Sequence, residues 1–232
     1  MTFWQSCALV LDIDGVIRDV SQSYRRALAD TVEEFAGQRP SPDDIDRLKQ
    51  EGFWNNDWEA SQELIRRLAP QVEVGYDRIV DFFQSRYRGQ NWDGYINDEP
   101  LLVSREFFAS LQDRGIVWGF FSGATRASAS FVLDRLGLVN QVLVAMEDAP
   151  GKPDPRGLIE VAHRLDRHQV IYVGDTVADM LTVVRAREQD QTRAYQAIGV
   201  IPPHVQDENS YGEVLRQQGA DRVLRRLIDL TF

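Results

Sequence analysis

The stretch Asp12-Ile13-Asp14-Gly15-Val16 decides the fold of this chain, because it follows directly on an apolar run at 7–11. The run has the composition of a buried strand. Two carboxylates two residues apart at its end repel each other, and the strand gains no stability from them. A bound divalent cation would remove this cost, since hard cations bind carboxylate and carbonyl oxygens. Acidic turns after strands also occur without any chemistry, so the stretch by itself leaves both interpretations open.

Three later segments also place polar residues after apolar runs or in a rigid loop. The apolar runs at 116–121 and 170–173 each end in a short polar segment, and a Pro-containing loop at 151–155 lies between them. Ligands of parallel sheets bind outside the carboxyl ends of the strands, so side chains at these ends meet at one edge. In chain order the four segments supply Asp12 and Asp14, then Ser122 and Gly123, then Lys152, and finally Asp175 and Asp179.

The apolar runs predict an α/β fold. Amphipathic segments of helical length separate the later runs, and the runs lie at 7–11, 116–121, 141–145, 170–173 and 194–200. Strands that alternate with helices favour a parallel sheet covered on both faces. We therefore predict a Rossmann-like parallel sheet core formed by residues 1–16 and 98–232.

The segment 17–97 differs from the rest because it contains helical patterns and no convincing strand run. One helix is expected to begin at Ser41-Pro42-Asp43-Asp44, with Ser41 as the N-cap, Pro at the first position and acids in the first turn. We predict that 17–97 forms a helical cap domain inserted into the core, with hinges near 15–19 and 97–100.

Composition and charge narrow the class of protein. The 36 acidic and 26 Lys and Arg residues give a formal net charge of −10, which argues against a nucleic-acid surface because such a surface needs a basic patch. Cys7 is the single cysteine, so no intrachain disulfide can form. No apolar run approaches the roughly 18 residues of a membrane span, and the N-terminus lacks a secretory signal pattern. We expect a cytoplasmic protein that contacts neither nucleic acid nor membrane, with its oligomeric state left open.

The four motifs, in this order and over essentially the whole chain, resemble those of the haloacid dehalogenase-like (HAD) superfamily, and the helical insert resembles the cap of its subfamily I. The resemblance implies a phosphatase that hydrolyses the phosphate monoester of a small metabolite through an aspartyl-phosphate. Asp12 would be the nucleophile, and Asp14 the general acid for the leaving oxygen and then the base for water. Ser122 and Gly123 would bind phosphoryl oxygens, and Lys152 would add a positive charge.

The same resemblance implies Mg²⁺ as the cofactor. An anionic phosphoryl group repels an anionic nucleophile, and a cation between them makes the attack electrostatically possible. Asp179 would bind the ion directly or hold its water ligands. The metal-binding residues would be Asp12, Asp14 through its backbone carbonyl, Asp175 and Asp179.

Candidate specificity residues lie in the predicted cap, in the stretch Gly52-Phe53-Trp54-Asn55-Asn56-Asp57-Trp58. Caps of subfamily I place such a loop over the core site, where Asn55, Asn56, Asp57 and Trp58 would contact the substrate. An aromatic packing anchor with helix-capping Asn and Asp explains the same stretch equally well. Arg18, shortly after the first motif, is a further candidate for contact with an anionic substrate.

Three other activities use related chemistry. A phosphomutase or phosphotransferase would form the same aspartyl-phosphate, and the sequence hardly separates it from a phosphatase. A haloacid dehalogenase is disfavoured, because those enzymes need no metal and usually lack the second Asp of the first motif, here Asp14. A phospho-acceptor regulatory protein also combines Asp, Mg²⁺, a hydroxyl residue and Lys, but such receivers are shorter and lack the helical insert.

Overall fold

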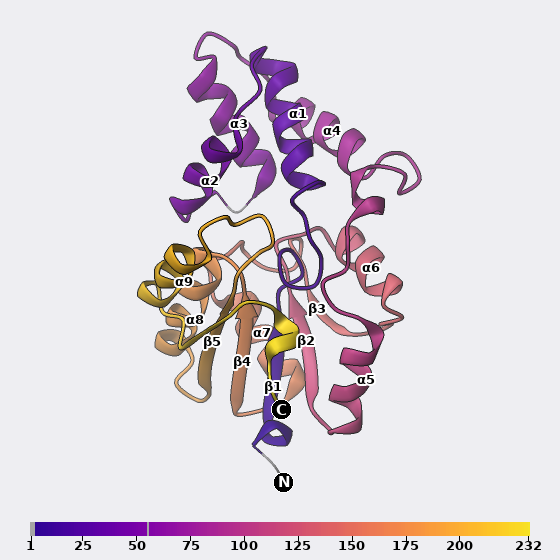
Figure 1. The fold of residues 1–232 in the computed structure, drawn as a ribbon, viewed down its shortest axis with the longest axis vertical. Coiled ribbons are helices and arrows are strands. Elements are labelled where there is room, and N and C mark those ends of the chain that lie inside the picture. Colours follow the sequence, from indigo (N-terminus) through magenta and orange to yellow (C-terminus); the bar gives the residue numbers. More distant parts are fainter. Residues whose placement is uncertain (1–2, 55) are drawn as a thin grey trace. The chain divides into compact units, whose positions relative to one another are not determined.

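The computed structural model describes residues 3–54 and 56–232, and the chain divides into two compact units. The core unit comprises Met1–Asp19 and Leu101–Phe232, and the cap unit comprises Val20–Pro100 (Figure 1).

The chain passes between the units at 19/20 and 100/101, a few residues later than the predicted 16/17 and 97/98. Backbone pairing explains the difference. Leu102 N donates to Ile17 O over 2.8 Å, and Arg18 forms an isolated antiparallel bridge with Leu101. These two short segments are therefore held to each other within the core unit.

A six-stranded parallel sheet forms the centre of the core unit, in the order β3-β2-β1-β4-β5-β6. This arrangement confirms the predicted α/β class with a Rossmann-like sheet. The strands are β1 (Cys7–Leu11), β2 (Val117–Phe121), β3 (Val142–Val144), β4 (Gln169–Gly174), β5 (Ala194–Val200) and β6 (Arg222–Leu224).

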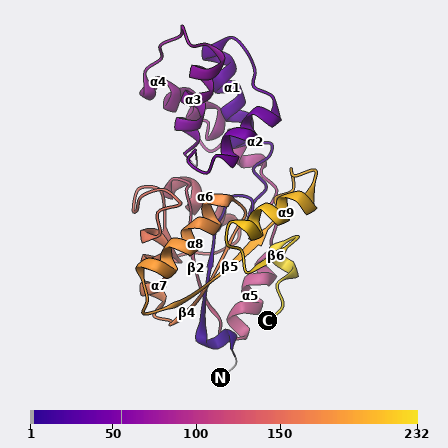
Figure 2. The same ribbon diagram turned by 90° about the vertical axis from the view of Figure 1, so that its left-hand side faces the viewer.

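Helices cover both faces of this sheet, as parallel strands joined by crossovers require (Figures 1 and 2). Side chains of α5 and α6 pack on one face, and side chains of α7, α8 and α9 pack on the other. The helices of the core unit are η1 (Trp4–Ser6), α5 (Arg105–Asp113), α6 (Arg126–Arg135), α7 (Arg156–Leu165), α8 (Val177–Gln189), α9 (Glu208–Gln217) and η3 (Leu227–Asp229).

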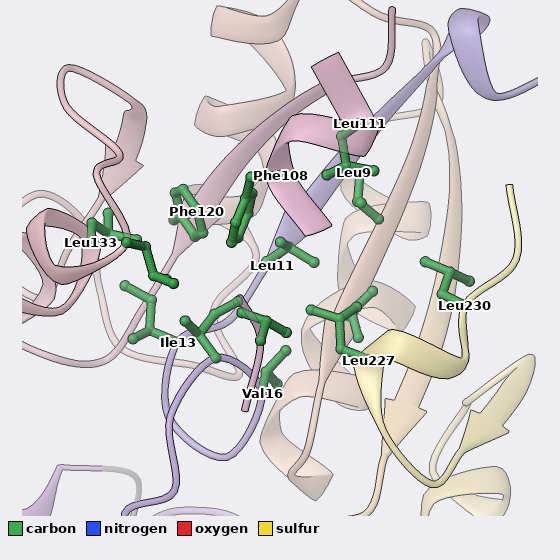
Figure 3. Close-up of a cluster of buried hydrophobic side chains, with 14 of the residues drawn as sticks. Leu9, Leu11, Ile13, Val16, Phe108, Leu111, Phe120, Leu133, Leu227 and Leu230 are labelled. Carbon is green, nitrogen blue, oxygen red and sulfur yellow. The ribbon is translucent and has the colours of Figure 1, made fainter. Parts of the chain in front are cut away.

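Strand β1 contributes side chains to both apolar layers, because successive residues of a strand point to opposite faces. Leu9 and Leu11 lie in the layer that contains Phe108 of α5 (Figure 3), whereas Val10 packs in the opposite layer. All five residues of β1 are buried. A slip of one residue would exchange the two sets of side chains, so the packing fixes the register of β1 and the point at which Asp12 leaves it.

The cap unit is helical, and no strand occurs among its described residues. The predicted helix start at Ser41 is confirmed: Ser41 Oγ accepts from Asp44 N, and the Asp44 carboxylate accepts from Ser41 N, which forms a capping box. Helix α1 packs against α3 and α4. The helices of this unit are α1 (Tyr24–Ala36), α2 (Pro42–Gln50), α3 (Asp57–Leu68), α4 (Tyr76–Tyr87) and η2 (Tyr95–Asp98).

Candidate active site

Asp12 is the first residue beyond β1, and the backbone holds it at the edge of the sheet. Its N–H donates to Val173 O on the neighbouring strand over 2.9 Å. Its carboxylate is also fixed, because Oδ1 accepts from Ile13 N at 2.8 Å and Oδ2 lies 2.8 Å from Lys152 Nζ. Only 5% of Asp12 is exposed, and this burial raises the pKa of its carboxyl to about 7 although Lys152 acts in the opposite direction.

Lys152 connects two of the predicted site carboxylates. Its Nζ lies 2.8 Å from Asp12 Oδ2 and 2.6 Å from Asp179 Oδ1. The ammonium also lies 5.4 Å from the ring centroid of Phe121 and 5.6 Å from that of Tyr172. Burial disfavours its charge, but the attraction of Asp12 and Asp179 outweighs burial and raises the pKa of Lys152. Lys152 therefore stays cationic beside the predicted nucleophile.

Asp179 lies at the start of α8, where both of its oxygens accept hydrogen bonds. Thr176, the N-cap residue, donates to Asp179 Oδ2 from its hydroxyl at 2.6 Å and from its N–H at 2.9 Å. Oδ1 accepts from Lys152 and from the phenolic hydroxyl of Tyr172, the latter at 2.8 Å. Burial would raise the pKa of Asp179, but the charge and hydrogen bonds of Lys152 and Thr176 prevail and lower it. Asp179 is thus an ionised carboxylate that holds Lys152 in place.

Asp175 supplies a third buried carboxylate at the end of β4, with 7% of the residue exposed. Burial, followed by the negative charges of Asp179 and Asp12, raises the pKa of Asp175 well above its ordinary range. One carboxylate oxygen from each of Asp12, Asp175 and Asp179 lies within 4.8 Å of the others. Three oxygens this close, in a site that penalises their charge, suit a hard divalent cation.

The loop after Asp12 brings Asp14 and Gly15 beside these carboxylates. The acidic cluster found among the described residues does not include the Asp14 side chain, which is ion-paired with Arg18. Gly15 has φ +73°, and a Cβ at this position would lie 2.0 Å from Asp175 Oδ2. Only glycine allows the loop to pass so close to the Asp175 carboxylate.

Ser122 and Gly123 follow β2, whose Phe120 is paired with Leu11 of β1. Ser122 is buried, with 1% exposed, and its N–H donates to Val144 O at 3.0 Å. Ser122 Oγ accepts from Ala124 N at 3.1 Å, which orients the hydroxyl while leaving its hydrogen able to donate. The structure thus places the predicted phosphate-binding residues at the same sheet edge as Asp12.

The predicted specificity residues of the cap have structural contacts of their own. Asn56 is the N-cap of α3, and its Oδ1 accepts from Trp58 N at 3.0 Å. The Asp57 carboxylate lies 2.6 Å from Lys49 Nζ. Asn55 lies outside the described residues. Contact of these residues with a substrate stays a prediction.

Tyr172 is the site residue that the sequence did not reveal. It occupies the middle of a strand of apolar residues, where an aromatic side chain is ordinarily part of the core. The available signal is chemical: a fully buried phenol requires a hydrogen-bond partner, and the motif that follows supplies two carboxylates, of which Asp179 accepts the bond.

Residues 8–187 match the family model described as haloacid dehalogenase-like hydrolase. The chain belongs to this family and is an enzyme, a hydrolase, which confirms the predicted relationship. The buried acidic cluster fits the metal binding expected of the site.

Individual proteins are similar to this chain over most of its length. The chain is 31% identical over 238 residues to an imidazoleglycerol-phosphate dehydratase from Phytophthora nicotianae, a match that covers 94% of this chain and 50% of that protein. The chain therefore spans half the length of this relative. Solved structures share the fold: a phosphatase from Thermococcus thioreducens has a TM-score of 0.65 at 22% identity, covering 90% of this chain and 99% of that chain. A β-phosphoglucomutase from Clostridium difficile has a TM-score of 0.67 at 16% identity. The match covers 97% of this chain and 93% of that chain.

Within the part of the chain that the structure describes, every helix is too short or too polar to cross a membrane.

Proposed function

We propose that the protein is a Mg²⁺-dependent phosphatase that hydrolyses the phosphate monoester of a small metabolite through an aspartyl-phosphate on Asp12. The observation that carries the proposal is the contact of Lys152 Nζ with Asp12 Oδ2 at 2.8 Å, next to two further buried carboxylates. A cation-flanked carboxylate at a strand end is suited to attack an anionic phosphoryl group, because positive charge offsets their repulsion.

The residues of the core unit supply the steps of such a reaction. Asp12 Oδ would form a bond to phosphorus while the bond from phosphorus to the ester oxygen breaks. The Asp14 carboxyl would give its proton to that leaving oxygen, and would then take a proton from the water that cleaves the aspartyl-phosphate. Ser122, the N–H of Gly123 and Lys152 would hold the phosphoryl oxygens in line with Asp12.

The donor set of the acidic cluster fits Mg²⁺, which prefers carboxylate oxygens and keeps several water ligands. Asp12 and Asp175 would bind the ion through carboxylate oxygens, and Asp14 through its backbone carbonyl. We assign Asp179 to water-mediated binding, because Lys152, Tyr172 and Thr176 already occupy its oxygens. When bound, the ion would neutralise negative charge shared by the nucleophile and the phosphoryl group.

A phosphomutase or phosphotransferase is the second candidate, and the structural likeness to a β-phosphoglucomutase supports testing it. Both reactions pass through the same aspartyl-phosphate and differ in whether water or a second hydroxyl takes the phosphoryl group. Membership of a hydrolase family favours water as the acceptor.

The substrate class can be narrowed through the longer relative, whose name refers to a phosphate ester that carries an imidazole. The half of that relative that matches this chain would act beside an enzyme for phosphorylated imidazole compounds. We therefore include imidazole-bearing phosphate monoesters beside sugar phosphates and phosphorylated acids in the substrate panel.

The test is phosphate release from this panel with Mg²⁺ present, repeated with EDTA and with a sugar-phosphate acceptor. We expect activity with Mg²⁺, loss of activity in EDTA, and weak support by Ca²⁺, because its looser coordination misplaces the reacting groups. Asp12→Asn should lower turnover by several powers of ten, whereas the exposed Asp134→Asn should not change it. Full activity in EDTA, or near-normal turnover of Asp12→Asn, would show that the proposed mechanism is wrong.

A further inference from the structure

The loop that follows Asp12 folds back so that Arg18 contacts the side chain of Asp14. Arg18 Nε and Nη2 lie 2.6 and 2.5 Å from Asp14 Oδ1. Arg18 is completely buried, whereas 24% of the Asp14 side chain is exposed. The guanidinium therefore approaches Asp14 from inside the protein, and the carboxylate keeps an open side.

Backbone hydrogen bonds fix the position of Arg18 independently of its side chain. Arg18 N donates to Ile13 O at 3.1 Å, and Arg18 O accepts from Gly15 N at 2.9 Å. The isolated bridge to Leu101 holds the same residue from the other side. An arginine whose backbone is held by three partners can serve as a rigid support for the side chain that it contacts.

The form of the ion pair is unusual for a purely stabilising contact. Arg and carboxylate pairs commonly form two parallel hydrogen bonds, one to each oxygen, which gives the strongest interaction. Here two of the three guanidinium nitrogens, Nε and Nη2, contact Oδ1, and Asp14 Oδ2 has no hydrogen-bond partner among the described residues 3–54 and 56–232. One oxygen is thus held, and the other is presented away from Arg18.

We propose that Arg18 is a positioning residue that orients Asp14, so that Oδ2 is the oxygen that exchanges a proton with the leaving group and with water. This inference rests on the proposed phosphatase function. General acid–base catalysis requires the carboxyl oxygen to lie within hydrogen-bond distance of the atom that it protonates. A carboxylate pinned through Oδ1 keeps Oδ2 in one place throughout both halves of the reaction.

Loss of Arg18 should lower kcat most for substrates whose leaving group needs a proton. Two aryl esters differ in this need for a proton. Phenyl phosphate has a poor leaving group, whereas the p-nitrophenolate of p-nitrophenyl phosphate leaves readily without protonation. We expect Arg18→Met to lower kcat on phenyl phosphate by about 10²-fold, the loss typical of misplacement by about 1 Å, and to lower kcat on p-nitrophenyl phosphate far less. Asp14→Asn should show the same preference, and the double variant should add little to either single change.

Two further variants keep the test decisive if Arg18→Met folds poorly. Arg18→Lys retains a buried cation but cannot place two donors on Oδ1, so it should show the same leaving-group dependence to a smaller extent. Arg25→Met removes another buried arginine that is paired with a carboxylate, Asp46 in the cap unit. It should lower stability without any dependence on the leaving group.

The outcomes separate this inference from the proposed function. Equal losses of kcat on both esters in Arg18→Met and Arg18→Lys would overturn the positioning role and leave Arg18 as a structural residue. If the unmodified protein hydrolyses neither ester, or if Asp12→Asn retains turnover, the proposed function itself fails.

Discussion

The phenolic hydroxyl of Tyr172 donates a 2.8 Å hydrogen bond to Asp179 Oδ1, the same oxygen that Lys152 Nζ contacts at 2.6 Å. Tyr172 is completely buried on β4. The carboxylate that holds Lys152 next to Asp12 is therefore itself held from the interior of the sheet.

We predict that Tyr172→Phe weakens metal activation as well as folding. A hydrogen bond to a charged group contributes about 1.5–3 kcal/mol, so the free energy of unfolding should fall by that order. The Mg²⁺ concentration for half-maximal activity should rise, because Asp179 would lose one of its supports. Tyr195→Phe is a matched control, since Tyr195 donates an equally long bond of 2.8 Å to Asp190. It should lose similar stability in urea titrations and keep the Mg²⁺ response, and an unchanged Mg²⁺ response in Tyr172→Phe would contradict the prediction.

Binding of Mg²⁺ should depend on pH. Burial raises the pKa of Asp12 to about 7 and that of Asp175 well above its ordinary range, so a cation must displace protons from them at low pH. Since these pKa values lie above the unfolded value of about 3.9, the stability of the cation-free protein falls as pH rises from about 4 through about 7.

Mg²⁺ should accordingly raise Tm more at pH 8 than at pH 5, as measured by differential scanning fluorimetry. Asp175→Asn should abolish most of the shift at pH 8. An equal rise in Tm at both pH values would show that the ion does not bind to these carboxylates.

Gly15→Ala should reduce activity by about 10²-fold, the loss associated with misplacement by about 1 Å, because its Cβ would displace the Asp175 carboxylate. The left-handed backbone at φ +73° adds a cost of about 1–2 kcal/mol for a residue with a side chain. Gly37→Ala isolates this second effect, since Gly37 has φ +69° and no atom within 4 Å of the added Cβ. We expect a loss of stability in both variants, at least as large in Gly15→Ala, and a loss of turnover in Gly15→Ala alone. Normal turnover of a folded Gly15→Ala would show that the site tolerates a shift of Asp175.

Asn56 allows the capping role to be separated from the predicted substrate contact. Asn56→Ala should lower stability by about 1 kcal/mol through loss of the N-cap of α3, whereas Asn56→Ser preserves a capping side chain. If Asn56 contacts substrate, Asn56→Ser should change the ratio of kcat/KM between a metabolite and p-nitrophenyl phosphate. An unchanged ratio would leave Asn56 as a helix cap only.

The sequence predicts the parts of the molecule that depend on local pattern. Runs of apolar residues identify β1 and β5 at their observed bounds and β4 to within one residue at each end, and the polar residues after β1 and β4 identify Asp12 and Asp175 as site residues. The sequence does not predict α5, because this helix is short and its Phe107-Phe108 pair is equally typical of a strand, although Ser104 occupies its N-cap position.

Contacts between side chains of different elements could not be predicted from the sequence. Tyr172 and Asp179 belong to a strand and the helix after it, and only the turn between them brings the phenol to the carboxylate. The position of Arg18 in the sequence suggests a substrate contact, whereas in the fold its side chain contacts Asp14 and its backbone pairs with the local loop and with Leu101.

The central place of β1 has a consequence for synthesis. It leaves the ribosome before the other strands of its sheet, yet Ala8 pairs with Val117 and Val170, which are made much later. The cap residues 20–100 are contiguous in the sequence and can form their helical contacts early. Strand β1 is still unpaired at that stage, because contacts between distant segments form slowly. During that interval an entirely apolar strand stays available to other chains, and the edge that carries Asp12 is completed only when β4 arrives.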